Sequence, residues 1–326
     1  MIFNIFISLV GFLMLYYGAG WLVKGSSSLA RSLGVTPIVI GLTVVAFGTS
    51  APELAVSLLS SIQGKSMIAV GNVVGSNICN IALVMGLAAT LRPITGHPIV
   101  VRRDIPVMLG VSLLLLALSA NSVLGRAEGA VLVAGIILYT AVNYYMARRE
   151  VQAGGPPEAV LADLGVERIE ADLSKTKAVL MLIVGIAGVV VGAQLVVNAA
   201  IKIMTVLGVS EKFIGLTIVA FGTSLPELAT SIVAAMRKEM DISIGNLVGS
   251  NVFNLLSVLG AAALVRPIPI PGGFVRSGLI YDYVFMILIS FLPWLMMRRN
   301  NTVSRGNGIL LLVCYGGYLA YLIAKT

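Results

Sequence analysis

Residues 41–53 read GLTVVAFGTSAPE and residues 215–227 read GLTIVAFGTSLPE, so each copy carries a glutamate, Glu53 or Glu227, in an otherwise apolar run. Over the longer windows 41–59 and 215–233, fourteen of nineteen residues are identical. An ionisable side chain at the centre of a membrane costs about 3 kcal/mol or more and by default marks an ion pathway or a proton relay. The repetition of so costly a feature indicates that it serves a function.

A second repeated motif follows each glutamate. Residues 71–80 read GNVVGSNICN and residues 245–254 read GNLVGSNVFN, again 174 positions apart. The step from the glutamate to the last asparagine of the motif is 27 residues in both copies. The offset relates the two halves without a gap, which indicates an internal duplication.

The composition places these motifs in a membrane protein, because 58% of the 326 residues are hydrophobic, 11% are charged and the mean hydropathy is +1.00. Stretches long enough to cross a bilayer recur at 1–23, 36–61, 66–91, 105–122, 127–147, 176–200, 210–235, 241–265, 277–297 and 307–324. The sequence predicts an all-α integral membrane protein of ten transmembrane helices. We expect a first five-helix repeat at 1–147, a linker at 148–175 and a second repeat at 176–326.

An odd number of spans in each half inverts the second repeat relative to the first, and such architectures place substrate at interrupted helices near the midplane. Loops on the side of the N-terminus hold seven Lys and Arg residues and the opposite loops hold fifteen. The positive-inside rule predicts a plasma (inner) membrane protein with both termini outside and a solvated, cytoplasmic linker. The scattered basic residues give no nucleic-acid surface. We expect membrane lipid and cations as partners, and no protein partner.

The first motif supplies oxygen ligands. Proline lacks an amide hydrogen and clashes with the carbonyl four residues earlier, so Pro52 and Pro226 are expected to break their helices. Freed backbone carbonyls at membrane depth are tolerated where they line a cavity. The neighbouring side chains add hydroxyl oxygens from Thr49, Ser50, Thr223 and Ser224.

The second motif supplies neutral oxygens from serine and asparagine, and Asn77 and Asn80 can share a helix face. Taken singly, such residues are more often helix kinks or interhelical hydrogen-bonding groups. The glutamates differ, since neither has a basic residue in its own span, and a bound cation is the simplest partner. Oxygen ligands without His or Cys favour calcium or sodium over a transition metal, and two carboxylates in one pocket balance one divalent ion.

At these residues the sequence resembles the calcium/cation antiporter superfamily, in particular prokaryotic sodium/calcium exchangers, over nearly the whole chain except the linker. The resemblance implies a core built from the second, third, seventh and eighth helices, against which the Gly-rich first and sixth helices slide. It implies direct calcium binding by Glu53 and Glu227, helped by Thr49 and Thr223. It also implies sodium sites that use Ser50, Ser76, Ser224, Ser250 and the backbone carbonyls of Ala46 and Ala220.

One position departs from the family pattern. Some exchangers carry aspartate at one of the positions of Asn80 and Asn254, whereas both are asparagine here. The expected pocket therefore holds two acidic groups, with both asparagines among its ligands, and a potassium requirement is less expected.

The expected function is sodium-driven calcium antiport by alternating access, without enzymatic activity or a cofactor and with Na⁺ and Ca²⁺ as transported ions. Proton/calcium exchange remains open, because a buried glutamate with a raised pKa could carry the proton. A passive cation channel is a further alternative, although it would not require an inverted repeat. An intramembrane serine hydrolase would need a membrane-embedded histidine, and His97, the one histidine, is expected in a solvated loop.

Overall fold

The computed structural model describes residues 1–152, 173–207 and 220–325, and the regular secondary structure of these residues is helical apart from four two-residue strands. Most of the predicted linker and the start of the predicted span at 210–235 lie outside the described residues. Of the described helices, seven are long and apolar enough to cross a membrane, and a bent pair, Pro37–Thr49 with Ala51–Ile62, can be counted as an eighth. The seven are Ile2–Leu33, Ser66–Leu91, Arg126–Arg149, Lys175–Val206, Met240–Val265, Leu279–Asn300 and Arg305–Ala324.

One helix has the reverse of the burial pattern of a helix in a water-soluble protein. The helix α4 (Ala51–Ile62) buries Glu53, Ser57, Ser60 and Ser61, which recur at helical spacing on one face. Its large apolar side chains Leu59 and Ile62 are exposed instead. Polar groups inside and apolar groups outside suit a helix whose outer face meets lipid.

The described chain forms two compact units, each of which takes segments from both halves of the sequence. Unit 1 comprises Met1–Ser50 and Val142–Asn246, and unit 2 comprises Ala51–Ala141 and Leu247–Thr326. Helices α8 (Arg126–Gln152) and α14 (Met240–Phe253) contribute residues to both. The other helices of unit 1 are α1 (Ile2–Leu33), α2 (Pro37–Ile40), the π-helical η1 (Gly41–Val45), α3 (Ala46–Thr49), α10 (Lys175–Val206), α12 (Ala220–Thr223) and α13 (Leu225–Met236).

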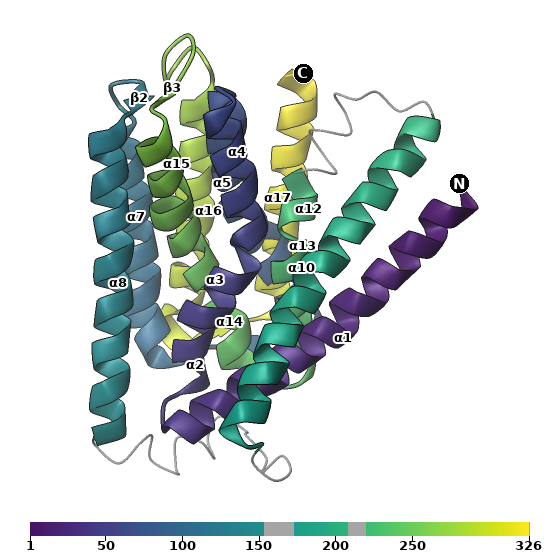
Figure 1. Ribbon diagram of the computed structural model, residues 1–326. Helices are drawn as coiled ribbons and strands as arrows, with labels where there is room; N and C mark the ends of the chain where they lie inside the picture. Colours follow the sequence, from purple (N-terminus) through teal and green to yellow (C-terminus); the bar gives the residue numbers. More distant parts are fainter. Residues whose placement is uncertain (153–172, 208–219, 326) are drawn as a thin grey trace. The chain divides into compact units, whose positions relative to one another are not determined.

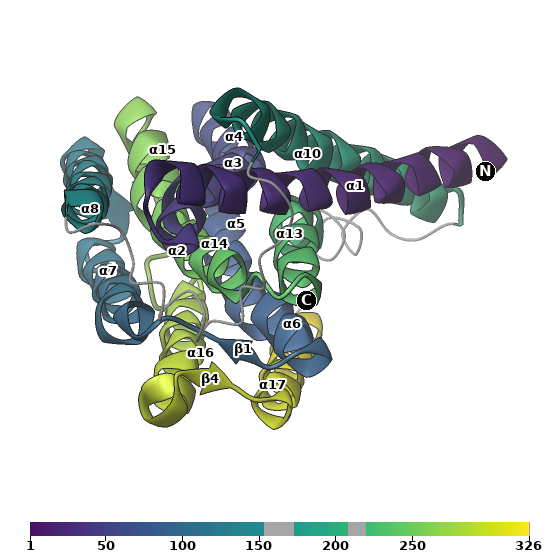
Figure 2. The ribbon, with the colours of Figure 1, turned by 90° about the horizontal axis from the view of Figure 1, so that it is seen from below.

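Unit 2 contains the remaining helices and all four described strands. Its helices besides α4 are α5 (Ser66–Ile78), the π-helical η2 (Cys79–Met85), α6 (Gly86–Leu91), the π-helical η3 (Val100–Asp104), α7 (Ile105–Leu118), the π-helical η5 (Asn254–Val258), α15 (Leu259–Val265), α16 (Leu279–Asn300) and α17 (Arg305–Lys325). Each antiparallel pair joins the two sequence halves: β1 (Ile94–Thr95) pairs with β4 (Thr302–Val303), seen in Figure 2, and β2 (Val123–Leu124) pairs with β3 (Ile268–Pro269).

In unit 1, α1 and α10 lie side by side (Figure 1), and glycines set their close approach. A Cβ atom added to Gly11 would lie 2.8 Å from the carbonyl oxygen of Gly192, and one added to Gly185 would lie 2.4 Å from the Leu22 nitrogen. Gly11, Gly185 and Gly192 therefore pack these two helices against each other, and the sliding of the helices against a core stays a prediction. Backbones this close leave no room for any side chain.

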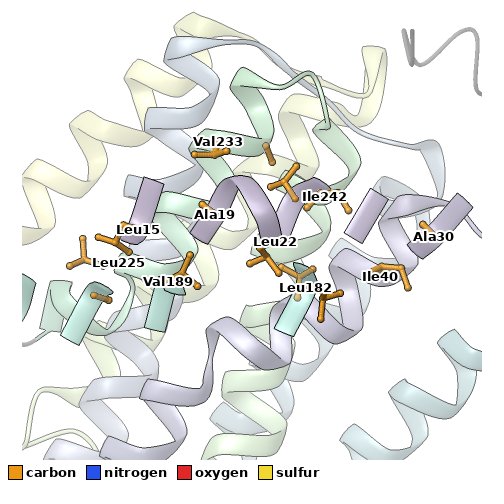
Figure 3. Close-up of a cluster of buried hydrophobic side chains, with 14 of the residues drawn as sticks. Leu15, Ala19, Leu22, Ala30, Ile40, Leu182, Val189, Leu225, Val233 and Ile242 are labelled. Carbon is orange, nitrogen blue, oxygen red and sulfur yellow. The ribbon is translucent and has the colours of Figure 1, made fainter. Parts of the chain in front are cut away.

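Buried apolar side chains complete the packing of unit 1. Figure 3 shows side chains of α1, α10 and α13 converging, among them Leu22, Val189 and Leu225. This cluster anchors α13, and with it Glu227, to the α1–α10 pair.

Candidate functional site

The helix is interrupted at the same place in both copies of the first motif. Helix α3 ends at Thr49 and α4 begins at Ala51, while α12 ends at Thr223 and α13 begins at Leu225. The intervening Ser50 and Ser224 have nearly equal backbone angles, φ −82° and ψ 6° against φ −86° and ψ 5°. Each break lies two positions before the motif's proline, and the predicted interruption is confirmed.

Within unit 1, the first copy of the motif contacts the second. The Ser50 hydroxyl donates to Oε1 of Glu227 over 3.3 Å, and the Thr49 hydroxyl donates to Oδ1 of Asn246 over 3.0 Å. Glu227 is fully buried, and so is the Ser224 hydroxyl, which has no hydrogen-bond partner in the part of the chain that the structure describes. A buried carboxylate thus lies among hydroxyl groups, which are ligands that hard cations accept.

The first asparagine of each second motif holds the helix that carries the glutamate. In unit 2, Nδ2 of Asn72 donates to Oγ of Ser57 over 2.9 Å and to the Glu53 carbonyl over 3.1 Å. In unit 1, Nδ2 of Asn246 donates to Oγ of Ser231 over 3.4 Å. Each serine lies one helical turn after its glutamate. Sequence reasoning did not assign this role, although both residues of the pair recur in both copies.

In unit 2, Asn77 and Asn251, which occupy equivalent positions in the two repeats, bind each other reciprocally. Nδ2 of Asn77 donates to the Asn251 carbonyl over 3.3 Å, and Nδ2 of Asn251 donates to the Asn77 carbonyl over 3.4 Å. Oδ1 of Asn251 accepts from Nδ2 of Asn80, and Oδ1 of Asn77 accepts from Nδ2 of Asn254, each over 3.1 Å. The four amides form a pseudo-symmetric network between α5–η2 and α14–η5.

This network orients two amide oxygens. The Nδ2 groups of Asn80 and Asn254 are used by the network, whereas their Oδ1 atoms are buried without a hydrogen-bond partner among the described residues. An unsatisfied buried acceptor costs about 1–3 kcal/mol. Both residues lie in π-helical segments, which are frequent at functional sites. The two oxygens are available to bind a cation.

The remaining predicted residues lie along the same interrupted helices. Thr223, Ser76 and Ser250 are buried. The Ala46 carbonyl accepts from the Ser50 amide over 3.0 Å and from the Thr49 hydroxyl over 3.4 Å, so it is not a freed carbonyl. Ala220 is the first residue of α12.

Neither a transition-metal site nor the alternative of a serine hydrolase finds support among the described residues. No three His, Cys, Asp or Glu side chains gather there to hold a metal ion. His97 lies in the loop after β1, as expected, where it is half-buried and accepts a hydrogen bond at Nδ1 from the Ile99 amide over 3.4 Å. Burial lowers the pKa of His97 and favours its neutral form.

Comparison with known proteins agrees with these features. The family model described as sodium/calcium exchanger protein matches residues 3–145 and again residues 177–324. The chain belongs to this exchanger family. It is therefore a transporter and not an enzyme, and it is a multi-pass membrane protein.

Relatives in this exchanger family span the whole chain. The inner membrane protein YrbG of Escherichia coli is 38% identical over 96% of this chain and 94% of its own. The sodium/calcium exchanger MaX1 of Methanosarcina acetivorans is 32% identical over 98% of both chains. A solved structure of the sodium-calcium exchanger NCX_Mj, soaked with 2.5 mM Na⁺ and 0.1 mM Ca²⁺, matches with a TM-score of 0.82 at 32% identity over 98% of each chain.

Proposed function

We propose that this exchanger moves calcium across the membrane against sodium, with Glu53 and Glu227 as the charged ligands of the transported ion. The observation that carries the proposal is the environment of Glu227, a fully buried carboxylate that accepts a hydrogen bond from the Ser50 hydroxyl of the other copy of the motif. The sequence repeats this arrangement at Glu53, which is also fully buried. The names of the relatives MaX1 and NCX_Mj support sodium and calcium as the ion pair.

The donor set fits the proposed ions. Calcium takes six to eight oxygen ligands, including carboxylates and carbonyls. In the proposal, Thr49 and Thr223 assist calcium binding, and sodium uses Ser50, Ser224, Ser76 and Ser250 with the carbonyl oxygens of Ala46 and Ala220. Asn80 and Asn254 contribute their unpaired Oδ1 atoms. The two carboxylates neutralise one calcium ion, whereas three sodium ions exceed their charge by one. Because calcium and sodium use the same carboxylates, they compete for the site.

We further propose ten transmembrane helices in two inverted five-helix repeats, with both termini outside and the linker in the cytoplasm. The strand pairs support the inversion, because β1 and β3 occupy equivalent places in the two repeats and each pairs with the other repeat. The repeats are proposed to alternate access to the ions. The inner-membrane relative YrbG supports an inner-membrane location.

Calcium-45 uptake by proteoliposomes tests the coupling. The purified full chain is reconstituted, and sodium, potassium and proton gradients are imposed separately at fixed calcium. Uptake should follow an outward sodium gradient without ATP and should ignore potassium. Uptake that ignores sodium but follows the proton gradient would assign the protein to proton/calcium exchange instead, and flux without any imposed counter-gradient would indicate a channel.

A further inference from the structure

A cavity of about 300 Å³ lies in unit 1, and none of its described lining residues belongs to the candidate cation site. It is bounded by the C-terminal third of α1, the end of α13 with the turn that follows, and Leu173, the second residue before α10. Its polar lining consists of Lys24, Ser27, Ser28, Arg31, Arg237 and Glu239. None of these side chains has a part in the proposed transport of cations.

Among the described residues that line the cavity, three side chains are basic and one is acidic, so this part of the lining is positively charged. Lys24 and Arg31 are seven residues apart, which places them on one face of α1, and both are half-buried. Arg237 is held in place from the other side, because its Nη1 donates to the Gly20 carbonyl over 2.9 Å. A cation would be repelled from this cavity, whereas an anion would be attracted.

A buried hydroxyl in the cavity wall needs an acceptor or a donor. Ser27 is 1% exposed, and its Oγ has no hydrogen-bond partner within the described segments. The first turn of α10, capped by Ser174, begins directly after Leu173, so free amide groups and the positive end of the helix dipole lie nearby. The orphaned hydroxyl, the two α1 cations and the helix end offer many donors and few acceptors.

We propose that this cavity binds a phosphate group, carried by an anionic phospholipid headgroup or free in solution. Phosphate presents several acceptor oxygens, which match the ammonium, guanidinium and hydroxyl donors. The volume corresponds to roughly ten waters at about 30 Å³ each, so it accommodates a glycerophosphate headgroup as well as the bare ion. Basic pockets at the ends of membrane helices are suited to such headgroups.

Binding to the detergent-purified full chain tests the proposal. The probes are phosphatidylglycerol, phosphatidylcholine and inorganic phosphate, each titrated while thermal unfolding is followed. Phosphatidylglycerol should raise Tm and phosphatidylcholine should not. The double variant Lys24→Gln/Arg31→Gln should weaken apparent binding about 25-fold at low salt, from about fivefold for each charge.

Two further variants separate a binding role from a general effect of charge. Lys202→Gln removes one positive charge from an exposed position on α10, as Lys24→Gln alone does within the cavity, and should leave binding unchanged. Ser27→Ala removes only the orphaned hydroxyl and should weaken binding without lowering the Tm of the lipid-free protein. A Tm rise with inorganic phosphate alone would support a soluble source, and a rise with phosphatidylglycerol alone would support a lipid. Equal weakening by Lys202→Gln and the double variant, or no response to either phosphate probe, would overturn the proposal.

Discussion

Replacement of Glu227 by glutamine is expected to abolish calcium transport and leave the fold intact. Glutamine has nearly the same shape, and its Oε1 can still accept the hydrogen bond that the Ser50 hydroxyl donates over 3.3 Å in the native protein. What the substitution removes is one of the two negative charges proposed to face the ion. The equivalent change Glu53→Gln should be similarly severe, because the two motifs are copies of each other.

The size of the effect follows from the ion's charge. A carboxylate oxygen binds Ca²⁺ at about 2.4 Å, and at an effective dielectric constant of about 20 the attraction is about 14 kcal/mol. The amide dipole of glutamine and its lower desolvation cost return part of this energy. If only about 4 kcal/mol is lost in net terms, calcium affinity falls about a thousandfold. Ser50→Ala removes one long hydrogen bond to the carboxylate and should cost about 1 kcal/mol, or about fivefold.

Sodium-driven calcium-45 uptake, measured over a range of calcium concentrations, checks this order of effects. Asp282→Asn is the control, because Asp282 is half-buried at the start of α16 and accepts from the Tyr318 hydroxyl over 3.1 Å, an interaction that asparagine keeps. Its transport should be close to that of the native protein. A correctly folded and inserted Glu227→Gln protein that exchanged calcium at a near-native rate would refute the assignment of Glu227 as a ligand.

Three further predictions concern charge movement, the amide network and helix packing. Exchange of three sodium ions for one calcium ion carries net current, so a potassium-diffusion potential should change the uptake rate, and an unchanged rate would argue for an electroneutral cycle. Asn251→Ala removes the acceptor of Asn80 Nδ2 and should lower the free energy of unfolding by about 2 kcal/mol, measured by denaturant titration in detergent. Gly185→Ala places a Cβ atom 2.4 Å from the Leu22 nitrogen and should destabilise the protein by about 1–3 kcal/mol. The control Gly317→Ala meets nothing within 4 Å and should be neutral. Equal Tm values for the two variants would contradict the packing argument.

Local chemistry made much of the fold predictable from the sequence. Pro52 and Pro226 predict helix breaks because a proline acts on its own helix, and the breaks at Ser50 and Ser224 follow. Apolar stretches of membrane length likewise predict the long helices. The recurrence of each motif at a constant offset predicts that their residues serve one function.

The residues that meet in the tertiary structure were harder to predict from the sequence. The glycines of α1 predict a close contact, but periodicity does not identify the helix on the other side, and Gly11 packs on Gly192. The pairing of Asn77 with Asn251 was missed for the same reason, since both asparagines are visible in the motifs and nothing local indicates that they meet. The resemblance implies the Ala46 carbonyl as a sodium ligand, and nothing in the sequence indicated that the Ser50 amide also donates to this oxygen across the helix break.

The reciprocal contact between Asn77 and Asn251 has a consequence for how the two repeats can diverge. At a pseudo-two-fold axis a residue meets its own counterpart, as in an isologous dimer interface. An amide suits such a place because it donates and accepts at once, whereas two carboxylates would repel and two ammonium groups would lack an acceptor. Each of the two side chains binds the backbone carbonyl of the other residue, and that carbonyl persists whatever side chain stands there. The pairs joined through side chains are Asn77 with Asn254 and Asn251 with Asn80, so we expect a substitution at one member of such a pair to be accompanied by a change at the other.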